Sequence, residues 1–158
     1  MTAERTESRK GRCLELAARL YLEVFGHGNL DAADEILAPD AVGHGPGSPP
    51  TAGTAFIKRQ AVVLRTAIPD LRVVLEDQLA DGDRVASRWS ASGVNSGPLR
   101  SSTGELSPTG SAIAFEEIRI DRFVGDRIVE SWFLPDRLTL WQQLGLVRIP
   151  GGGPGRGG

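Results

Sequence analysis

The spacing of apolar residues divides the chain into a helical first half and a β-rich second half. In the first half they recur every three or four positions, which is the period of an amphipathic helix. The helices predicted from this period cover residues 4–25, 30–37 and 54–68. In the second half, apolar and polar residues tend to alternate, as they do along a strand. The strands predicted there cover residues 71–79, 84–92, 113–124 and 127–134.

Turn and cap residues connect and end these elements. Asp81-Gly82 and Gly125-Asp126 lie between successive strands, and short turns of this composition favour antiparallel hairpins. After the last strand, Asp136 can cap a short helix over residues 137–144. Gly145 suits the position that follows a helix, because glycine readily adopts a positive φ. The chain is therefore expected to close with a hairpin and a capped helix.

Helices that precede antiparallel strands are typical of an α+β fold. We expect a cone-shaped α+β barrel, in which a curved, mostly antiparallel sheet wraps around the N-terminal helices. Residues 1–148 would form this single domain, and the Gly/Pro-rich residues 149–158 would be a disordered tail. Residues 41–53 are predicted as a loop or short strand, and 93–110 as a flexible flap. A cone has a mouth, and small-molecule sites favour such concavities.

Charge and composition narrow the range of partners. The chain has 158 residues and a formal net charge of −2, so it lacks the basic field that nucleic-acid binding requires. No apolar run approaches the roughly 20 residues that span a bilayer, and the polar N-terminal segment lacks the apolar core of a signal peptide. The single cysteine, Cys13, agrees with a reducing compartment. We therefore expect a cytoplasmic protein that binds neither nucleic acid nor membrane.

Four segments, in this order, resemble a known family. They are VFGHGNLDAADEILAPDAV at 24–42, IPDLRVVLEDQLADGDRVASRWSASG at 68–93, RFVGDRIVESWFLPD at 122–136 and the terminal QQLG. Together they resemble the SnoaL-like polyketide cyclases, within the nuclear-transport-factor-2-like superfamily of α+β cones. The resemblance implies a homodimer with a deep apolar pocket and an apolar small-molecule substrate from secondary metabolism. It also implies side-chain chemistry that needs neither a metal nor an organic cofactor.

One departure from the family pattern bears on mechanism. The resemblance implies an acid/base Asp on the last strand, three residues before the Asp of the closing helix, and that position holds Phe133. The related limonene-type epoxide hydrolases also place an essential Asp there. The position of an assisting His on the preceding strand holds Arg119. Because phenylalanine cannot move a proton, an enzyme with this sequence uses a different constellation of residues or catalyses a different reaction.

The first candidate is the row Glu117, Arg119 and Asp121, whose side chains share one face of a strand. The family resemblance turns this face toward the pocket. A carboxylate there, with its pKa raised by burial, could exchange a proton with the substrate, and Arg119 could hold an enolate or carboxylate oxygen. The alternative is a solvated or dimer-facing row, since Ile118 and Ile120 supply the apolar alternation.

Two further residues could carry protons. His44 lies in VGHGPG, where family members line the mouth of the pocket, and a histidine pKa near 6.5 suits proton transfer at neutral pH. The alternative is that His44 is an exposed loop residue without a function. Asp136 could act in catalysis or in its support, or could simply cap the closing helix.

The expected substrate-binding residues are Phe25, Trp89, Ser131 and Phe133. Trp89 and Phe133 would wall a pocket for a flat polycyclic or polyene substrate, although core packing explains them equally well. Trp132 is expected at a dimer interface, and Trp141 in the core.

These observations leave two functional hypotheses open. One is a cofactor-independent tailoring enzyme that catalyses cyclisation, isomerisation or epoxide opening of an apolar intermediate. The other is a non-catalytic ligand-binding or accessory protein that assists a partner oxidoreductase.

Overall fold

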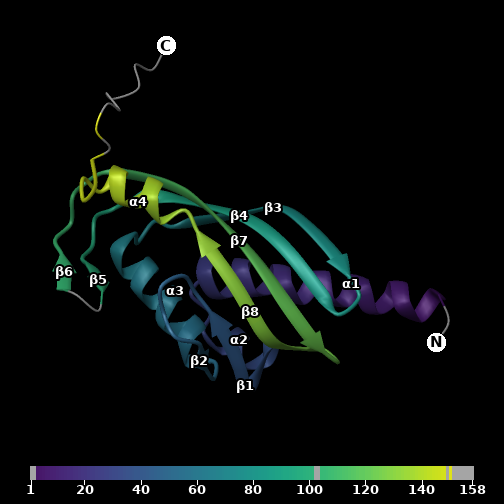
Figure 1. Cartoon of the computed structure of the whole chain (residues 1–158). Coiled ribbons are helices and arrows are strands. Elements are labelled where there is room, and N and C mark those ends of the chain that lie inside the picture. Colours follow the sequence, from purple (N-terminus) through teal and green to yellow (C-terminus); the bar gives the residue numbers. More distant parts are fainter. Residues whose placement is uncertain (1–2, 102–103, 149, 151–158) are drawn as a thin grey trace, which may run out of the picture.

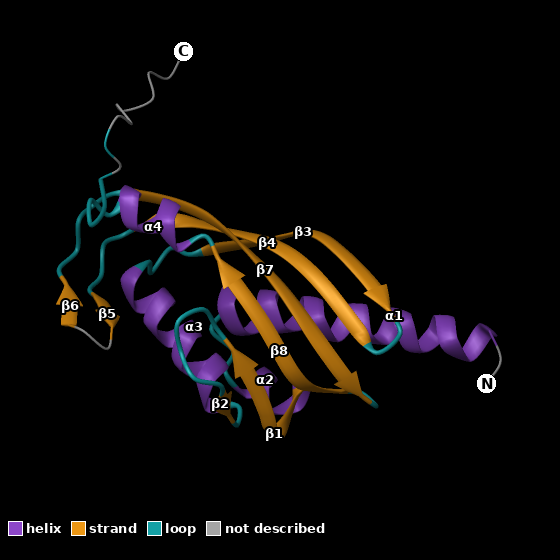
Figure 2. Ribbon diagram, viewed as in Figure 1, coloured by secondary structure: helices purple, strands orange, loops and turns teal. Residues whose placement is uncertain are grey.

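A curved sheet with a layer of helices against its inner face makes up the fold (Figure 1). The computed structural model describes residues 3–101, 104–148 and 150. The two layers confirm the expected α+β cone, with helices first and strands second (Figure 2). The tail predicted over residues 149–158 lies outside the described residues, apart from residue 150.

The helical half follows the predicted pattern. Residues 3–26 form one helical run, in which α1 (Ala3–Arg19) continues into the wider turns of η1 (Leu20–Gly26). Two shorter helices follow, α2 (Asp31–Ile36) and α3 (Ala55–Ala67). The buried residues of η1 are Leu20, Tyr21, Val24 and Phe25. Their apolar stripe packs into the core between helices and sheet.

Six strands form the sheet in the order β2-β1-β8-β7-β4-β3. Their bounds are β1 Leu37–His44, β2 Thr51–Ala52, β3 Arg72–Asp81, β4 Arg84–Val94, β7 Ala112–Val124 and β8 Arg127–Pro135. Only the β1–β8 pair is parallel among them. The expectation of a mostly antiparallel sheet is therefore confirmed.

β1 is the element that the sequence pattern misplaces. The apolar period extends a helix to residue 37, but Leu37 already begins a strand that runs along β8. Pro39 explains the change, because proline has no N–H for a helical hydrogen bond and disfavours helical geometry in the residue before it. The strand then continues to His44, through residues predicted as a loop or short strand.

A small hairpin lies in the stretch between β4 and β7 that is predicted as a flexible flap. It consists of β5 (Leu99–Ser101) and β6 (Gly104–Leu106), here called the β5–β6 arm. The buried side chain of Asn95 fixes both ends of the stretch. Its amide donates to the carbonyl of Ala67 at 3.0 Å, and its Oδ1 accepts from the backbone N–H of Thr109 at 2.9 Å. The arm is thereby fastened to the end of α3.

The closing helix α4 (Arg137–Gln143) lies against the first residues of β7. The side chain of Gln143 exchanges two hydrogen bonds with the backbone of Ala114, both 2.9 Å long. Gly145 has a φ of 74° and ends the helix as expected. The expectation that Trp141 lies in the core is wrong, since this residue is 41% exposed. α4 instead leaves an apolar side facing outward.

Candidate active site

The inner face of β7 carries the charged row. Glu117 is 7% exposed, and Arg119 and Asp121 are fully buried. The intervening Ile118 and Ile120 are 52% and 37% exposed on the outer face. The orientation implied by the family resemblance is therefore right, and the solvated row suggested by apolar alternation is wrong. Charges can be buried in this row because they have partners there.

Glu117 and Arg119 form an ion pair at the centre of the row. Nε and Nη2 of Arg119 lie 3.0 and 2.8 Å from the same carboxylate oxygen of Glu117, Oε1. Nη2 also lies 3.4 Å from Oε1 of Gln60. The guanidinium sits 4.8 Å from the ring centroid of Phe133, so the phenylalanine in the family's acid/base position packs on this cation. Nη1 of Arg119 has no hydrogen-bond partner among the described residues.

Asp121 is fully buried and lies between two hydroxyl groups. Its Oδ1 accepts a hydrogen bond from the hydroxyl of Ser131 at 2.5 Å, and its Oδ2 from the hydroxyl of Tyr21 at 2.9 Å. Burial raises the pKa of Asp121, while the charge of Arg119 and these hydrogen bonds oppose the shift. The structure therefore gives Asp121 and Ser131 a place in the buried network, rather than at a surface that a substrate can reach.

A cavity of about 190 Å³ opens between α3, the sheet and α4, here called the inner cavity. Its aromatic lining consists of Phe25, Trp89, Phe115 and Phe133, and its polar lining of Gln60, Glu117 and Arg137. Three of the four expected substrate-binding residues are therefore at the cavity. Leu99 of the β5–β6 arm also borders it. The aromatic rings make the cavity apolar, with a few polar groups among them, as is usual for small-molecule sites.

Glu117 is the ionisable carboxylate in the lining of the inner cavity. Burial raises its pKa, and the charge and hydrogen bonds of Arg119 oppose that shift. Trp89 lies opposite Glu117 in the β4–β7 ladder, and its buried indole N–H interacts with the Glu117 carboxylate and also opposes the upward shift of its pKa. The cavity therefore combines a carboxylate that can take up a proton with an indole N–H beside it.

His44 lies on the opposite face of the sheet from Glu117. It pairs with Trp132 in the β1–β8 ladder and stacks on that ring at a centroid distance of 5.2 Å. Its Nε2 lies 2.9 Å from Oε1 of Glu130. The preceding Gly43 faces inward, where a side chain would collide with Phe56. Because β1 extends to residue 44, strand alternation turns the histidine outward, so the structure does not place it at the expected pocket mouth.

Asp136 caps α4, which is the second of the two roles predicted for it from the sequence. Its Oδ1 accepts a hydrogen bond from the backbone N–H of Thr139 at 3.0 Å. The hydrogen bonds with Thr139 lower the pKa of Asp136, so this carboxylate is a weak base. It lies outside the inner cavity and borders a larger depression instead.

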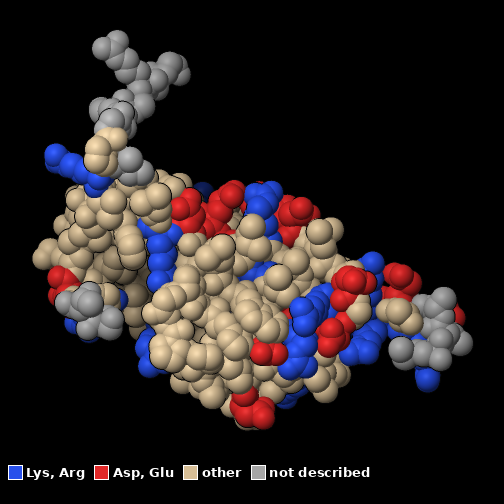
Figure 3. Space-filling model, in the orientation of Figure 1, with Lys and Arg blue, Asp and Glu red and all other residues tan. Residues whose placement is uncertain are grey.

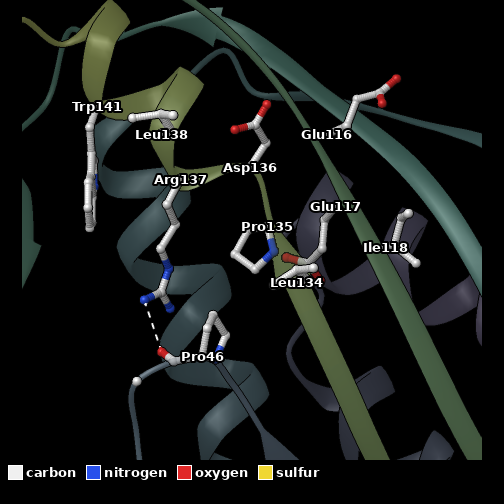
Figure 4. A pocket seen from close by; sticks show the side chains of 11 residues that line it. Pro46, Glu116, Glu117, Ile118, Leu134, Pro135, Asp136, Arg137, Leu138 and Trp141 are labelled. Atoms are coloured by element: carbon white, nitrogen blue, oxygen red, sulfur yellow. Dashed lines mark hydrogen bonds between the residues drawn. The ribbon is translucent and has the colours of Figure 1, made fainter. Parts of the chain in front are cut away.

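That depression, here called the α4 groove, has a volume of about 660 Å³ (Figure 4). Its apolar lining includes Pro46, Ile118, Leu134, Pro135, Leu138 and Trp141. Glu117 and Arg137 border both the groove and the inner cavity. Sequence reasoning missed Arg137, Gln60 and Phe115, although the position of Arg137 at the start of the closing helix marks it as close to the mouth of the cone.

Comparison with known families identifies the fold. A model of the SnoaL-like polyketide cyclase family matches residues 15–144. The chain belongs to this SnoaL-like family. Membership supports a tailoring role in secondary metabolism. No curated protein sequence matches the chain significantly.

Solved structures of SnoaL-like proteins have the same architecture. A protein described as a SnoaL-like polyketide cyclase from Jannaschia sp. CCS1 superposes with a TM-score of 0.77 at 20% identity, covering 89% of this chain and 96% of that one. A second, described as a polyketide cyclase from Bacillus cereus ATCC 10987, has a TM-score of 0.72 at 28% identity, with coverages of 87% and 83%. IdmH from Streptomyces antibioticus, described as a polyketide cyclase, has a TM-score of 0.70 at 30% identity, with coverages of 84% and 98%.

The surface of this SnoaL-like chain carries mixed charges. Figure 3 shows uncharged residues over the middle of one face, with acidic and basic groups intermixed toward its edges. In the described part of the chain, no helix is both long and apolar enough to cross a bilayer.

Proposed function

We propose that this protein is a cofactor-independent tailoring enzyme that moves protons on an apolar, carbonyl-bearing intermediate of secondary metabolism. The reaction would be an intramolecular cyclisation or an isomerisation. The observation that carries the proposal is Glu117, a carboxylate in the wall of an aromatic cavity, paired with Arg119 through one oxygen only.

Glu117 would act as the base. Its carboxylate takes a proton from a carbon next to a carbonyl group, and the electron pair of that C–H bond passes to the carbonyl oxygen as an enolate. The N–H of Trp89, which interacts with the ionised Glu117 carboxylate, would donate to this oxygen once Glu117 has taken up the proton. Burial raises the pKa of Glu117 and so makes it a stronger base, while Arg119 holds its position and favours its ionised form.

The enolate then has two outcomes. In a cyclisation, its carbon attacks a second carbonyl carbon of the same molecule, a C–C bond forms, and the new alkoxide takes the proton back from Glu117. In an isomerisation, the proton returns to a different carbon. Neither route needs an oxidant or a co-reactant. Epoxide opening would need a second group to activate water, and in the described lining of the inner cavity Glu117 is the one carboxylate.

Arg119 and Asp121 would support this base without touching the substrate. Arg119 lies behind Phe133 and fixes the carboxylate of Glu117. Asp121, with Tyr21 and Ser131, supplies negative charge near the guanidinium and so helps to keep it in place. These two residues therefore change from the expected catalytic groups to positioning residues.

The decisive experiment incubates the pure protein with candidate polyketone intermediates, without any added cofactor. We expect conversion by the wild type and a loss of about 100-fold or more in kcat for Glu117→Gln. Glu76→Gln is the control, because Glu76 is an exposed strand carboxylate that borders none of these cavities. The wild type should also exchange the substrate's acidic C–H for deuterium in D₂O, and Glu117→Gln should not.

Two outcomes would contradict the proposal. Wild-type turnover by folded Glu117→Gln would remove the assigned base. Tight binding of these intermediates without conversion or deuterium exchange, followed by conversion on addition of an oxidoreductase, would establish the accessory role instead.

The protein is also proposed to act as a homodimer, as its SnoaL-like relationship implies. The outer face of the sheet supports this, because Val74, Leu79 and Ile120 are exposed there on β3 and β7, outside the α4 groove. Ile120→Glu should halve the mass measured in solution, whereas Val62→Glu on the exposed side of α3 should leave it unchanged. A monomeric wild type would refute the dimer.

A further inference from the structure

Three cavities meet at one arginine. Arg137 borders the inner cavity, the α4 groove and a third cavity of about 120 Å³ between β1, α3 and Phe133. The three volumes are formed by segments far apart in the sequence, and Arg137 is the residue that borders all of them in the described chain. A side chain in this place is positioned to touch a ligand in any of the three cavities.

Arg137 forms no ion pair among residues 3–101 and 104–148, and neither does Arg59, which borders the third cavity with it. Arg119 binds Glu117 at 2.8 Å, and Arg122 binds Glu130 at 2.9 Å. Arg137 makes one long hydrogen bond, from Nη1 to the carbonyl oxygen of Pro46 at 3.4 Å. Figure 4 shows its side chain pointing toward Pro46 and away from the carboxylate of Asp136.

The surroundings of Arg137 are largely apolar, although the carboxylates of Glu116, Glu117 and Asp136 also border the α4 groove. Leu138 and Trp141 of α4 border the groove and are 49% and 41% exposed. The aromatic rings of Phe25, Trp89 and Phe133 line the inner cavity. A half-buried guanidinium that is not paired with these carboxylates can bind a planar anion, because its N–H groups match a carboxylate in pairs.

Size gives a second argument for joint use of these cavities. The inner cavity, at about 190 Å³, is smaller than the roughly 300 Å³ at which ligand sites usually begin, whereas the α4 groove, at about 660 Å³, lies within their range. The two share Glu117, Pro135 and Arg137 as lining residues. These three residues lie between the two volumes, so a substrate that occupies both has to pass Arg137.

We propose that Arg137 binds a carboxylate of the substrate at this junction, so that the substrate is an apolar, ring-containing carboxylic acid. Its reacting end enters the inner cavity toward Glu117, and the rest of its apolar body lies in the α4 groove against Trp141. This inference rests on the proposed function and adds the substrate class and the residue that selects it.

The test compares two ligands that differ in charge but not in shape, 2-naphthoate and 2-naphthamide, by isothermal titration calorimetry on the full chain. We expect the wild type to bind the acid at least ten-fold more tightly than the amide. Arg137→Gln should lose this preference while its affinity for the amide stays the same. Arg137→Lys should recover part of it, because lysine restores the charge but not the paired N–H groups.

Arg100→Gln is the matched control, since Arg100 is an exposed arginine paired with Glu105 on the β5–β6 arm and borders none of the three cavities. It should keep the full preference for the acid. Thermal unfolding of each variant excludes misfolding as the cause of any loss. Trp141→Ala should weaken the binding of the acid and of the amide to the same extent, because both ligands would stack on the same indole ring.

Equal affinity of the wild type for the acid and the amide would overturn the inference, and so would an unchanged preference in folded Arg137→Gln. A third contradicting result would be an Arg137→Gln variant that keeps the preference for the acid but changes its mass in solution. The last would assign the α4 groove to a second copy of the chain. Failure of the proposed function can be distinguished from failure of this inference. Turnover by Glu117→Gln would contradict the assigned base, whereas the same variant should still bind the acid more tightly than the amide if Arg137 selects the carboxylate.

Discussion

Arg119 directs both Nε and Nη2 to a single oxygen of Glu117, and leaves the second carboxylate oxygen free of this pairing. The two residues are neighbours on the inner face of β7, so the strand itself sets their spacing. One half of the carboxylate is therefore fixed and the other half can react. In the proposed reaction, this division would let a buried ion pair serve as both a structural contact and a base.

The first prediction concerns the pH dependence of turnover. Because burial raises the pKa of Glu117, kcat/KM should fall as the pH decreases through a value above the ordinary glutamate pKa of about 4.3. The base is active when ionised, so activity is present above this pKa and lost below it. A pH–rate profile of the wild type tests this. The same acid limb in Glu117→Gln would show that another group titrates.

The second prediction separates Asp121 from catalysis. Asp121→Ala removes the acceptor of two buried hydroxyl groups and a negative charge near Arg119, and should lower the free energy of unfolding by about 2–4 kcal/mol. Turnover of the protein that remains folded should stay within about two-fold of wild type, as expected for a residue away from the cavity. Urea unfolding and kcat measured on the same preparation give both quantities. A 100-fold loss of kcat in stably folded protein would return Asp121 to the active site.

The sign of the pH effect on stability provides a third prediction. The folded-state pKa of Asp121 is raised above its unfolded value, so its stabilising contribution is present at acid pH and is lost as the pH rises through the raised pKa. Asp121→Asn stays uncharged and should lose less stability than the wild type between acid and neutral pH. Urea midpoints at several pH values check this. Parallel pH curves for the two proteins would contradict it.

The fourth prediction tests the placement of His44. His44→Ala should keep turnover within about two-fold of wild type, because the imidazole contacts Glu130 and Trp132 on the outer face of the sheet. Steady-state kinetics on a converted intermediate decides the point. A large loss of kcat in folded monomer or dimer would place this histidine in the reaction after all.

The fifth prediction concerns cavity size. Phe133→Ala should enlarge the inner cavity, cost about 2–4 kcal/mol of stability, and shift binding from 2-naphthoate toward the larger 2-anthroate. Phe56→Ala is the control, because Phe56 stacks on Phe133 but borders a different cavity. It should destabilise the protein without changing the preference for ligand size. Calorimetry with both acids gives the result.

Much of the fold follows from the sequence because local patterns and tertiary structure agree. Alternation over residues 84–92 and 127–134 predicts β4 and β8 closely, and Asp136 with Gly145 marks both ends of α4. β1 is the exception. Its strand geometry comes from pairing with β8 across more than eighty residues, and its own Pro and Gly residues carry no strand signal.

The site is harder to predict, because alternation says which residues share a face but not which face is inside. In the middle of β7, Ile118 and Ile120 occupy the outer face, and Glu117, Arg119 and Asp121 occupy the inner one, opposite to the usual arrangement. Only the family resemblance oriented this strand. The junction at Arg137 is formed by α4, β1 and α3 together, so no local pattern could reveal it.

Asn95 has a consequence for how such a cone can diversify. A single buried amide fastens both ends of the β5–β6 arm to the end of α3, while Leu99 of the arm reaches the rim of the inner cavity. The residues that anchor the β5–β6 arm are therefore different from the residue that borders the inner cavity. Residues between the two ends can be exchanged, lengthened or grafted from a relative to alter substrate range, and the barrel beneath keeps its architecture.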